Sequence, residues 1–207
     1  MKTKINEILI ASGNKGKLVE IAQLLGGIGI KAISAADFNL VEPEENGETF
    51  EENSLIKARY YGDATGIIAL ADDSGLCVDF LDGKPGIHSA RWAFNEDNGG
   101  KDFDLAFRRI KEALLLKNID LENQIINSHF VCNLTIYDPQ NKDFKSFEGR
   151  VDGKIIFPPR GGNGFGYDPI FIADGMKETF GEILPAKKDQ ISHRSLAFEK
   201  LIKHFSN

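Results

Sequence analysis

Residues 5–17 read INEILIASGNKGK, and the order of apolar and polar residues in this segment indicates how the chain begins to fold. An apolar run ends at Ala11 and is followed by the polar turn Ser12-Gly13-Asn14. From Lys17 to Leu25, apolar side chains recur at the spacing of one face of a helix. The pattern therefore predicts a buried strand that leads through a tight loop into a helix.

Helices and strands continue to alternate in the first half of the chain. Thr49, with Glu52 at the third position after it, predicts a capping box at the start of a helix that runs to about residue 63. Asp72 and Asp73 are predicted to lie in a turn at the end of a buried strand. The apolar runs that we interpret as strands cover residues 30–34, 67–71 and 76–80.

The second half of the chain has a different pattern. Helical spacing returns between Asp102 and Leu116, and two alternating stretches joined by the turn Asp138-Pro139-Gln140-Asn141 then predict an antiparallel hairpin. A glycine-rich loop, a short strand and a closing helix are predicted at residues 161–167, 170–173 and 189–205. Helix-separated strands followed by a hairpin are typical of the α/β class, with a mixed β-sheet flanked by helices.

The composition limits the class of protein. The chain has 207 residues, 42% of them hydrophobic and 27% charged, which predicts a single globular domain over residues 1–207. Its formal net charge of −6 argues against duplex nucleic acid as a partner, because such binding needs a broad basic face. No apolar stretch reaches the ~18 residues of a membrane span, and no signal peptide is predicted. Cys77 and Cys132 are predicted to be buried thiols, and we expect a cytoplasmic location.

The loop from Ser12 to Lys17 is the first candidate for chemistry. Free N–H groups and the helix dipole at a strand-to-helix turn favour a phosphate. The spacing is not that of the Walker A loop G-x-x-x-x-G-K-S/T, because Gly13 and Gly16 lie too close together and Leu18 follows the lysine. An ordinary connection with two solvated lysines explains the residues at least as well.

The pair Asp72 and Asp73 is the second candidate. Adjacent strand residues point to opposite faces, so that one carboxylate can face a site while the other faces away. Proteins hold Mg²⁺ with carboxylates, waters and substrate phosphates, and Glu44 and Glu45 lie in an acidic loop earlier in the chain. A simple turn accounts for the same two aspartates.

The glycine-rich segment from Gly161 to Pro169 is the third candidate. Its glycines allow the backbone to approach a ligand, and Phe165 or Tyr167 offers a stacking face to a base. A flexible surface loop is the plain alternative. Lys188 and the triplet Ser192-His193-Arg194 add cations near the end of the chain, although such a triplet is more often a surface feature.

Six segments of the chain, in this order, resemble the inosine triphosphate pyrophosphatase family along nearly the whole length. They are Ala11 to Lys17, Thr49 to Asn53 with Lys57-Ala58, Ala71 to Leu76, Pro85 to Arg91, Gly164 to Phe171, and Ile191 to Arg194. Any one of them can occur by chance, but six in register hardly can. The resemblance implies a long twisted mixed β-sheet flanked by helices, two lobes with a nucleotide cleft between them, and usually a homodimer.

The resemblance also implies an enzyme that hydrolyses ITP, dITP and XTP to the nucleoside monophosphate and pyrophosphate with Mg²⁺. It gives Asp73 as the catalytic proton acceptor, and Glu44 and Asp73 as the metal ligands. The implied nucleotide-binding residues are Ser12, Gly13, Asn14, Lys15, Gly16, Lys17, Ser74, Phe165, Gly166, Tyr167, Asp168, Lys188, His193 and Arg194.

Some positions depart from the family pattern without removing a proposed catalytic group. Ser12 stands where threonine is frequent, Ser54 where alanine is common, and Phe94 where glycine is expected. Glu44 is aligned through a variable loop, so Glu45 is an alternative metal ligand.

Base preference is expected to involve Arg194, which should converge with Lys17 and Lys188 on the nucleotide. Arg194 has only hydrogen-bond donors, which suit the 6-oxo group of hypoxanthine or xanthine and oppose the 6-amino group of adenine. An unmet hydrogen bond costs ~1–3 kcal/mol, so Arg194→Ala is expected to narrow the preference for ITP over ATP. Two alternatives stay open: a Maf-like pyrophosphatase acting on modified pyrimidine triphosphates, and a nucleotide-sensing module without turnover.

Overall fold

The computed structural model describes residues 5–97 and 99–206, and the chain divides into two compact units. The first unit comprises Met1–Asp73, Cys132–Gly149 and Arg194–Asn207. The second unit comprises Ser74–Val131 and Arg150–His193. Each unit has a hydrophobic core of its own. The single domain expected over residues 1–207 stays a prediction.

The principal sheet is mixed. Its strand order is β2-β1-β3-β6-β7-β8, in which β1 is parallel to β2 and β3, and β7 is antiparallel to β8. The strands are β1 Glu7–Ile10, β2 Lys31–Ser34, β3 Ala69–Val78, β4 Phe94–Asn95, β5 Gly100–Lys101, β6 Ile126–Asp138, β7 Asp143–Ile155 and β8 Phe171–Ala173. The α-helices are α1 Lys15–Gly27, α2 Phe50–Thr65, α3 Ser89–Trp92, α4 Phe103–Leu116, α5 Pro185–Lys188 and α6 His193–Ser206. The predicted mixed sheet flanked by helices is confirmed, whereas the two lobes around a cleft stay a prediction.

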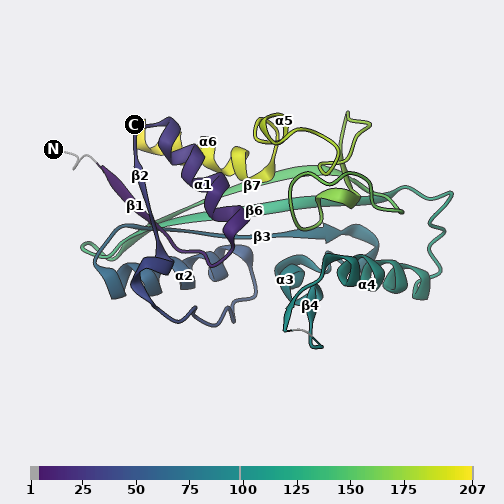
Figure 1. Ribbon diagram of the computed structural model, residues 1–207, viewed down its shortest axis with the longest axis horizontal. Helices are drawn as coiled ribbons and strands as arrows, with labels where there is room; N and C mark the ends of the chain where they lie inside the picture. The colour runs from purple at the N-terminus through teal and green to yellow at the C-terminus, as the bar shows by residue number, and fades with distance from the viewer. Residues whose placement is uncertain (1–4, 98, 207) are drawn as a thin grey trace. The chain divides into compact units, whose positions relative to one another are not determined.

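Helices cover both faces of the sheet within the first unit (Figure 1). Ile8 of β1 and Leu70 of β3 pack in one core with α1 and α6. Their neighbours in sequence, Leu9 and Ala71, pack in another core with α2. Because successive strand side chains point to opposite faces, every residue of β3 in this unit faces one helical layer or the other.

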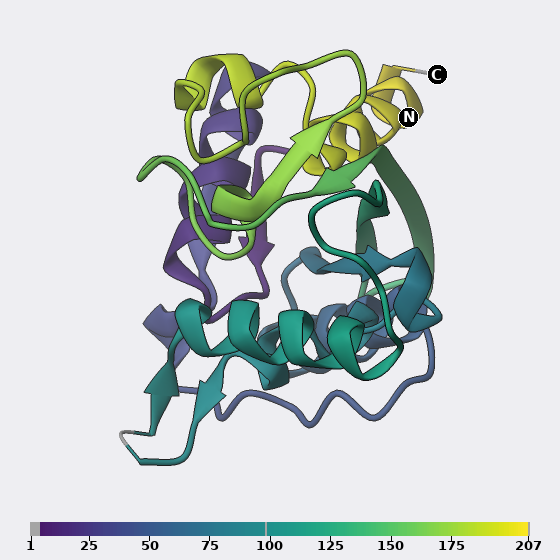
Figure 2. The ribbon, with the colours of Figure 1, turned by 90° about the vertical axis from the view of Figure 1, so that its right-hand side faces the viewer.

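Helix α4 supplies much of the core of the second unit. Asp102 caps the helix by accepting a hydrogen bond from the Leu105 N–H at 3.0 Å, as its position before the apolar stripe suggests. The buried face of α4 includes Phe107 and Ile110 and packs with residues of β3, β6 and β8. Figure 2 shows α4 beside the short hairpin of β4 and β5, which completes this side of the unit.

Strand β3 corrects one interpretation of the sequence. The residues Asp72-Asp73-Ser74-Gly75 are predicted as a turn between two strands, but they lie inside the continuous strand Ala69–Val78. The sheet keeps these turn-forming residues extended because β3 runs between β1 and β6. Gly75 also passes so close to Gly86 that an added Cβ would lie 2.2 Å from the Gly86 carbonyl oxygen. The sheet therefore holds both aspartates, where a turn would leave them loosely placed.

The closing helix corrects a second interpretation. One helix is predicted over residues 189–205, but the structure has the short helix α5, a turn at residues 189–192, and then α6 from His193. Pro185 stands at the first position of α5, where its missing N–H costs nothing. The break places two buried side chains, Lys188 and His193, on separate helices.

Several local predictions are confirmed. The capping box at the start of α2 is present, with Thr49 Oγ1 accepting from the Glu52 N–H and Glu52 accepting from the Thr49 N–H. Cys77 and Cys132 are both buried and unlinked. No helix in the described part of the chain combines the length and the apolar composition that a bilayer span requires.

Candidate active site

The loop between β1 and α1 is shaped by Asn14. The Asn14 Oδ1 atom accepts hydrogen bonds from the N–H groups of Gly16 at 3.0 Å and Lys17 at 3.3 Å, and the Asn14 N–H donates to Ser12 Oγ at 3.2 Å. Two of the amides that the sequence offers to a phosphate are thus satisfied within the loop. The side chains of Lys15 and Lys17 therefore carry the positive charge that this loop can present to an anion.

Asp72 is the centre of a buried ionic cluster on the face of β3 that α1 and α6 cover. Its Oδ2 atom lies 3.1 Å from Lys17 Nζ and 3.1 Å from Arg194 Nη2. The other guanidinium nitrogen of Arg194 donates to the carboxylate of Glu20. We call Lys17, Glu20, Asp72 and Arg194 the Asp72 cluster. It ties α1, β3 and α6 together through charge-assisted hydrogen bonds, which are the strong ones.

Asp73 faces the opposite layer, where it meets Lys57 of α2. Lys57 Nζ lies 3.9 Å from Asp73 Oδ1 and 2.5 Å from Glu45 Oε1. Lys57 and Asp73 are both buried, whereas the Glu45 side chain is 29% exposed. We call Glu45, Lys57 and Asp73 the Asp73 cluster. The alternation predicted for the two aspartates is therefore present, with each carboxylate held in its own ionic environment.

Burial raises the pKa of Asp73 to about 6. Desolvation is the main cause, since it disfavours the charged carboxylate, and the charges of Glu45 and Asp72 act in the same direction. Lys57 and Lys17 oppose this rise without cancelling it. A carboxyl group with this pKa is a far better proton acceptor near neutral pH than an exposed aspartate.

This pKa makes metal-free stability depend on pH. Because the folded pKa exceeds the ordinary value of 3.8, the folded state binds more protons than the unfolded state between about pH 4 and 6, and stability falls as pH rises through that window. Above pH 6, the charged Asp73 lowers the free energy of unfolding by roughly 2–3 kcal/mol, and Asp73→Asn removes this loss. In EDTA, the variant should melt higher than wild type at about pH 7.5 and equally at about pH 4. Exposed Asp174→Asn is the control, and a lower melting temperature for Asp73→Asn at the higher pH would contradict the assignment.

Glu45, and not Glu44, is the acidic-loop residue that the structure brings to Asp73. Glu44 is exposed, whereas Glu45 contacts Lys57 and its charge raises the pKa of Asp73. The loop is fixed on the first turn of α2, because Asn53 Oδ1 accepts from the Gly47 N–H at 2.8 Å. The metal-ligand proposal therefore moves from Glu44 to Glu45, the alternative that the sequence left open.

A second set of expected site residues lies in the second unit, around Asp168. The Asp168 Oδ2 atom accepts from Lys188 Nζ at 2.7 Å and from the Phe165 N–H at 2.8 Å. Lys188 Nζ also lies 4.7 Å from the centre of the Phe165 ring, a cation–π contact. Gly164 has a φ of +72°, and an added Cβ would lie 2.1 Å from Asp168 Oδ2. Glycine is therefore required for the loop to close on Asp168.

The two aromatic residues of this loop differ in what they can do. Tyr167 is buried, and its hydroxyl donates to the Ser89 carbonyl oxygen at 2.8 Å. Phe165 is half-buried and keeps part of its ring open to solvent. Phe165 is therefore the better stacking face for a base. His193 is also buried, and its ring stacks on Phe130 with 4.7 Å between ring centres.

The remaining expected site residues take simple positions. Ser74 is half-buried in β3, Gly166 has a φ of +70° in the loop before β8, and Lys15 begins α1. Lys17 and Arg194 do converge, on Asp72 in the first unit, whereas Lys188 binds Asp168 in the second. Convergence of all three on one nucleotide stays a prediction.

Sequence reasoning missed several residues of these clusters. Lys57 was noticed only as part of a motif, and Glu20 and Phe130 had no assigned role. Lys57 stands two turns after the capping box on the face of α2 that carries buried Ala58, which is a signal that a charged residue is being buried. Glu20 and Phe130 carry no such local signal, because their partners are distant in sequence.

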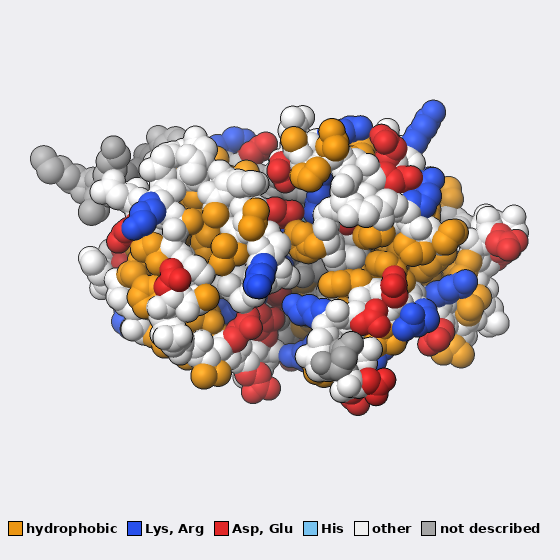
Figure 3. Space-filling view, viewed as in Figure 1, with side chains coloured by type: hydrophobic (Ala, Val, Ile, Leu, Met, Phe, Trp, Pro, Cys, Tyr) orange, Lys and Arg blue, Asp and Glu red, His pale blue; other side chains and the backbone are white. Residues whose placement is uncertain are grey.

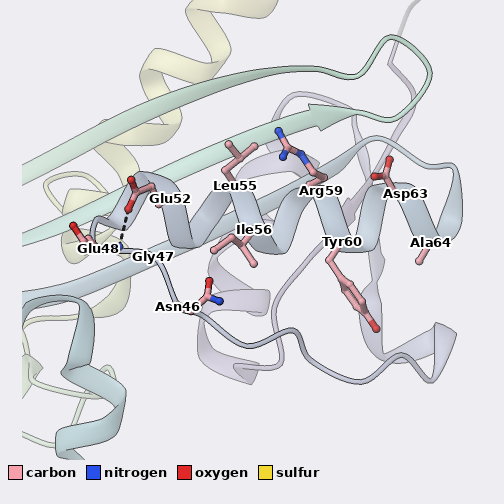
Figure 4. A pocket seen from close by; sticks show the side chains of 10 residues that line it. All are labelled: Asn46, Gly47, Glu48, Glu52, Leu55, Ile56, Arg59, Tyr60, Asp63 and Ala64. Carbon is pink, nitrogen blue, oxygen red and sulfur yellow. Dashed lines mark hydrogen bonds between the residues drawn. The ribbon is translucent and has the colours of Figure 1, made fainter.

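The hollowed surface of the first unit is separate from these clusters. A groove of about 900 Å³ runs along the exposed side of α2, and Figure 4 shows Leu55, Ile56, Arg59 and Tyr60 among its lining residues. Neither Lys57 nor Asp73 lines it. On the face drawn in Figure 3, acidic and basic side chains are interspersed and do not form one basic stripe.

A model of the Ham1 family matches residues 8–204 of the chain. The chain belongs to the Ham1 family. It is 47% identical over 195 residues to the dITP/XTP pyrophosphatase of Zymomonas mobilis, with 94% of this chain and 90% of that protein covered. It is 43% identical over 210 residues to the dITP/XTP pyrophosphatase of Agrobacterium fabrum, covering 98% of this chain and 97% of that protein.

Solved structures of Ham1 proteins share the fold. The HAM1 protein of Coxiella burnetii superposes with a TM-score of 0.83 at 37% identity and covers 97% of this chain and 98% of its own. A dITP/XTP pyrophosphatase of Mycobacterium abscessus gives a TM-score of 0.72 at 37% identity, with 94% and 97% covered. The Ham1 assignment thus rests on sequence and structure together.

Proposed function

We propose that this Ham1 protein hydrolyses ITP, dITP and XTP to the nucleoside monophosphate and pyrophosphate. The single observation that carries the proposal is the pair of buried aspartates in β3, with Asp72 bound to Lys17 on one face and Asp73 facing Lys57 on the other. Its Ham1 relatives named dITP/XTP pyrophosphatase supply the reaction and the substrate class. These products require cleavage of the α–β phosphoanhydride, and we propose that water attacks the α-phosphorus.

Asp73 supports this reaction as a proton acceptor. A carboxylate of ordinary pKa near 3.9 is a weak base at pH 7, but burial raises the pKa of Asp73 toward the working range in the metal-free protein. Lys17 is the proposed partner of the triphosphate, since phosphoryl transfer gains most from cations that neutralise the phosphate oxygens. Charge neutralisation and proton acceptance are therefore assigned to two residues of the first unit.

The donor set of the Asp73 cluster fits Mg²⁺. The carboxylates of Glu45 and Asp73, from two separate segments, converge on one cationic atom, Lys57 Nζ. Among the described residues, no group of three or more His, Cys, Asp and Glu side chains forms a metal site. Mg²⁺ commonly uses only one or two carboxylates, with waters and substrate phosphates as its other ligands. We therefore propose Glu45 and Asp73 as its ligands; when bound, it would polarise phosphate oxygens and acidify water.

Base recognition is proposed for the residues around Asp168 in the second unit. Phe165 supplies the stacking face, and Lys188 and His193 lie in the same unit as that ring. Arg194 is 2% exposed, and its donors already serve Asp72 and Glu20, so its support for base preference is weaker than the sequence suggests. Discrimination against GTP must come from the shape around the 2-position of the base.

The assembly and the location of this protein are proposed on the family resemblance. We propose a homodimer, which size-exclusion chromatography with light scattering would measure. We propose a cytoplasmic location on the nucleotide substrate of the relatives.

A substrate panel tests the proposed function. Purified protein is incubated with ITP, dITP, XTP, GTP, ATP and TTP, in Mg²⁺ or in EDTA, and pyrophosphate and orthophosphate are measured separately. The expected result is pyrophosphate from ITP, dITP and XTP in Mg²⁺ and none in EDTA. Preference for a modified pyrimidine triphosphate would support a Maf-like activity, and binding without release would support a nucleotide sensor.

A further inference from the structure

Lys57 occupies an unusual position for a lysine. Only 4% of the residue is exposed, whereas lysine is almost never buried unless it is paired. Its ammonium contacts two carboxylates from different segments, Glu45 of the loop before α2 and Asp73 of β3. A buried ammonium costs several kcal/mol unless such partners compensate it. Lys57 and these two carboxylates therefore depend on one another.

The same two carboxylates are the ligands proposed above for Mg²⁺, so the inference rests on that part of the proposed function. We propose that Lys57 is a positioning residue that holds Glu45 and Asp73 together in the metal-free protein and yields Glu45 when the metal binds. An ammonium is a compact point charge on a flexible stem, so it can neutralise a site and then move aside.

The contacts of Lys57 are unequal in a way that fits this exchange. The distance to Glu45 is 2.5 Å, a direct hydrogen bond, whereas the distance to Asp73 is 3.9 Å, at the limit of an ion pair. The Glu45 side chain is 29% exposed, and the Asp73 side chain is only 7% exposed. Glu45 is thus the ligand with freedom to turn, and Asp73 is the fixed one.

Loop anchoring explains why Lys57 can hold Glu45 in place. The N–H of Gly47 donates to Asn53 Oδ1 at 2.8 Å, and the N–H of Glu48 donates to Glu52 Oε2 at 2.7 Å. Glu45 and Lys57 therefore belong to one frame built on the first turns of α2. Lys57 links this frame to the carboxylate of Asp73 in β3.

The charge balance of the two clusters predicts how a variant behaves. The Asp72 cluster and the Asp73 cluster together hold four carboxylates and three cations, so their net charge is −1. The carboxylates are those of Glu20, Glu45, Asp72 and Asp73, and the cations are those of Lys17, Lys57 and Arg194. Replacing Lys57 by methionine keeps the length of the chain and leaves two excess negative charges. The metal-free protein should then lose stability, and a divalent cation should restore it.

The test compares wild type, Lys57→Met, and the control Lys142→Met, which removes an exposed ion pair with Asp63. Thermal unfolding is measured in EDTA, in MgCl₂, and in NaCl at the same ionic strength, and Mg²⁺ alone is titrated by calorimetry. Lys57→Met should have a lower melting temperature than wild type in EDTA, and Mg²⁺ should raise its melting temperature by more than it raises that of wild type. The variant should also bind Mg²⁺ at least ~10-fold more tightly, a difference of about 1.4 kcal/mol in binding free energy. The control should gain as much from Mg²⁺ as wild type.

Two results would overturn the inference. One is an equal rise in melting temperature with Mg²⁺ in Lys57→Met and wild type, and the other is weaker Mg²⁺ binding by the variant. If Lys57→Met does not fold in EDTA, the double variant Lys57→Met with Glu45→Gln tests the proposal instead. This double variant restores the charge balance, so it should recover most of the lost stability in EDTA and no longer respond to Mg²⁺; failure to recover overturns the proposal. Because no nucleotide is present, this result is independent of whether the enzyme releases pyrophosphate.

Discussion

Asp73→Asn is expected to lower kcat for ITP by about 10²-fold or more, because the variant loses both the proton acceptor and a proposed metal ligand. The asparagine side chain has the same shape, so the strand and its neighbours should persist. Steady-state pyrophosphate release in saturating Mg²⁺ is the measurement. The same variant is expected to be more stable than wild type near neutral pH, which separates a chemical loss from unfolding.

Two comparisons sharpen this result. Asp174→Asn, at an exposed position of the second unit, should leave turnover unchanged. If Asp73→Asn keeps nearly full turnover, the Asp73 carboxylate does not take part in the reaction. If the variant loses stability along with turnover, Asp73 has a structural role only.

Arg194→Ala is expected to have the second large effect, a loss of about 3–5 kcal/mol in the free energy of unfolding. The reason is that Asp72 is fully buried and would lose one of its two cationic partners, while Glu20 would lose its guanidinium. Denaturant unfolding of wild type and variant measures the difference. A loss below about 1 kcal/mol, the usual size for an exposed ion pair, would show that the cluster is not buried in solution.

Arg150→Ala is the matched control for Arg194→Ala, since it breaks an exposed pair with Asp152. The double variant Arg194→Met with Asp72→Asn should recover part of the stability, because position 72 no longer carries a charge in the interior. Where Arg194→Ala stays folded, its ratio of activity on ITP to activity on ATP tests the expected role in base preference. An unchanged ratio would assign the residue to structure alone.

Local signals predicted much of the fold. The strand, loop and helix at the start of the chain, and the capping box at Thr49, depend on neighbouring residues and are visible as spacing. The turn expected at Asp72 and Asp73 was wrong, because their turn propensity is overridden by pairing within a sheet whose other strands lie far away in sequence. The single closing helix was wrong for a similar reason, since Lys188 is drawn to Asp168 before α6 begins.

The candidate site was predicted in part. The family motifs identified Asp73 and Lys17, which the structure places on neighbouring elements of one unit. The roles of Lys57 and Glu20 depend on which charges meet inside the fold, and sequence spacing cannot show that. The choice of Glu45 over Glu44 likewise required the loop geometry set by the first turn of α2.

Hydrolysis of ITP in water labelled with a heavy oxygen isotope tests the central claim most directly. Water that attacks the α-phosphorus leaves its oxygen in the monophosphate, and mass spectrometry of both products locates it. We predict one labelled oxygen in IMP and none in pyrophosphate. Label in pyrophosphate would contradict attack on the α-phosphorus, and release of orthophosphate as the first product would contradict the assignment of this Ham1 protein as a pyrophosphatase.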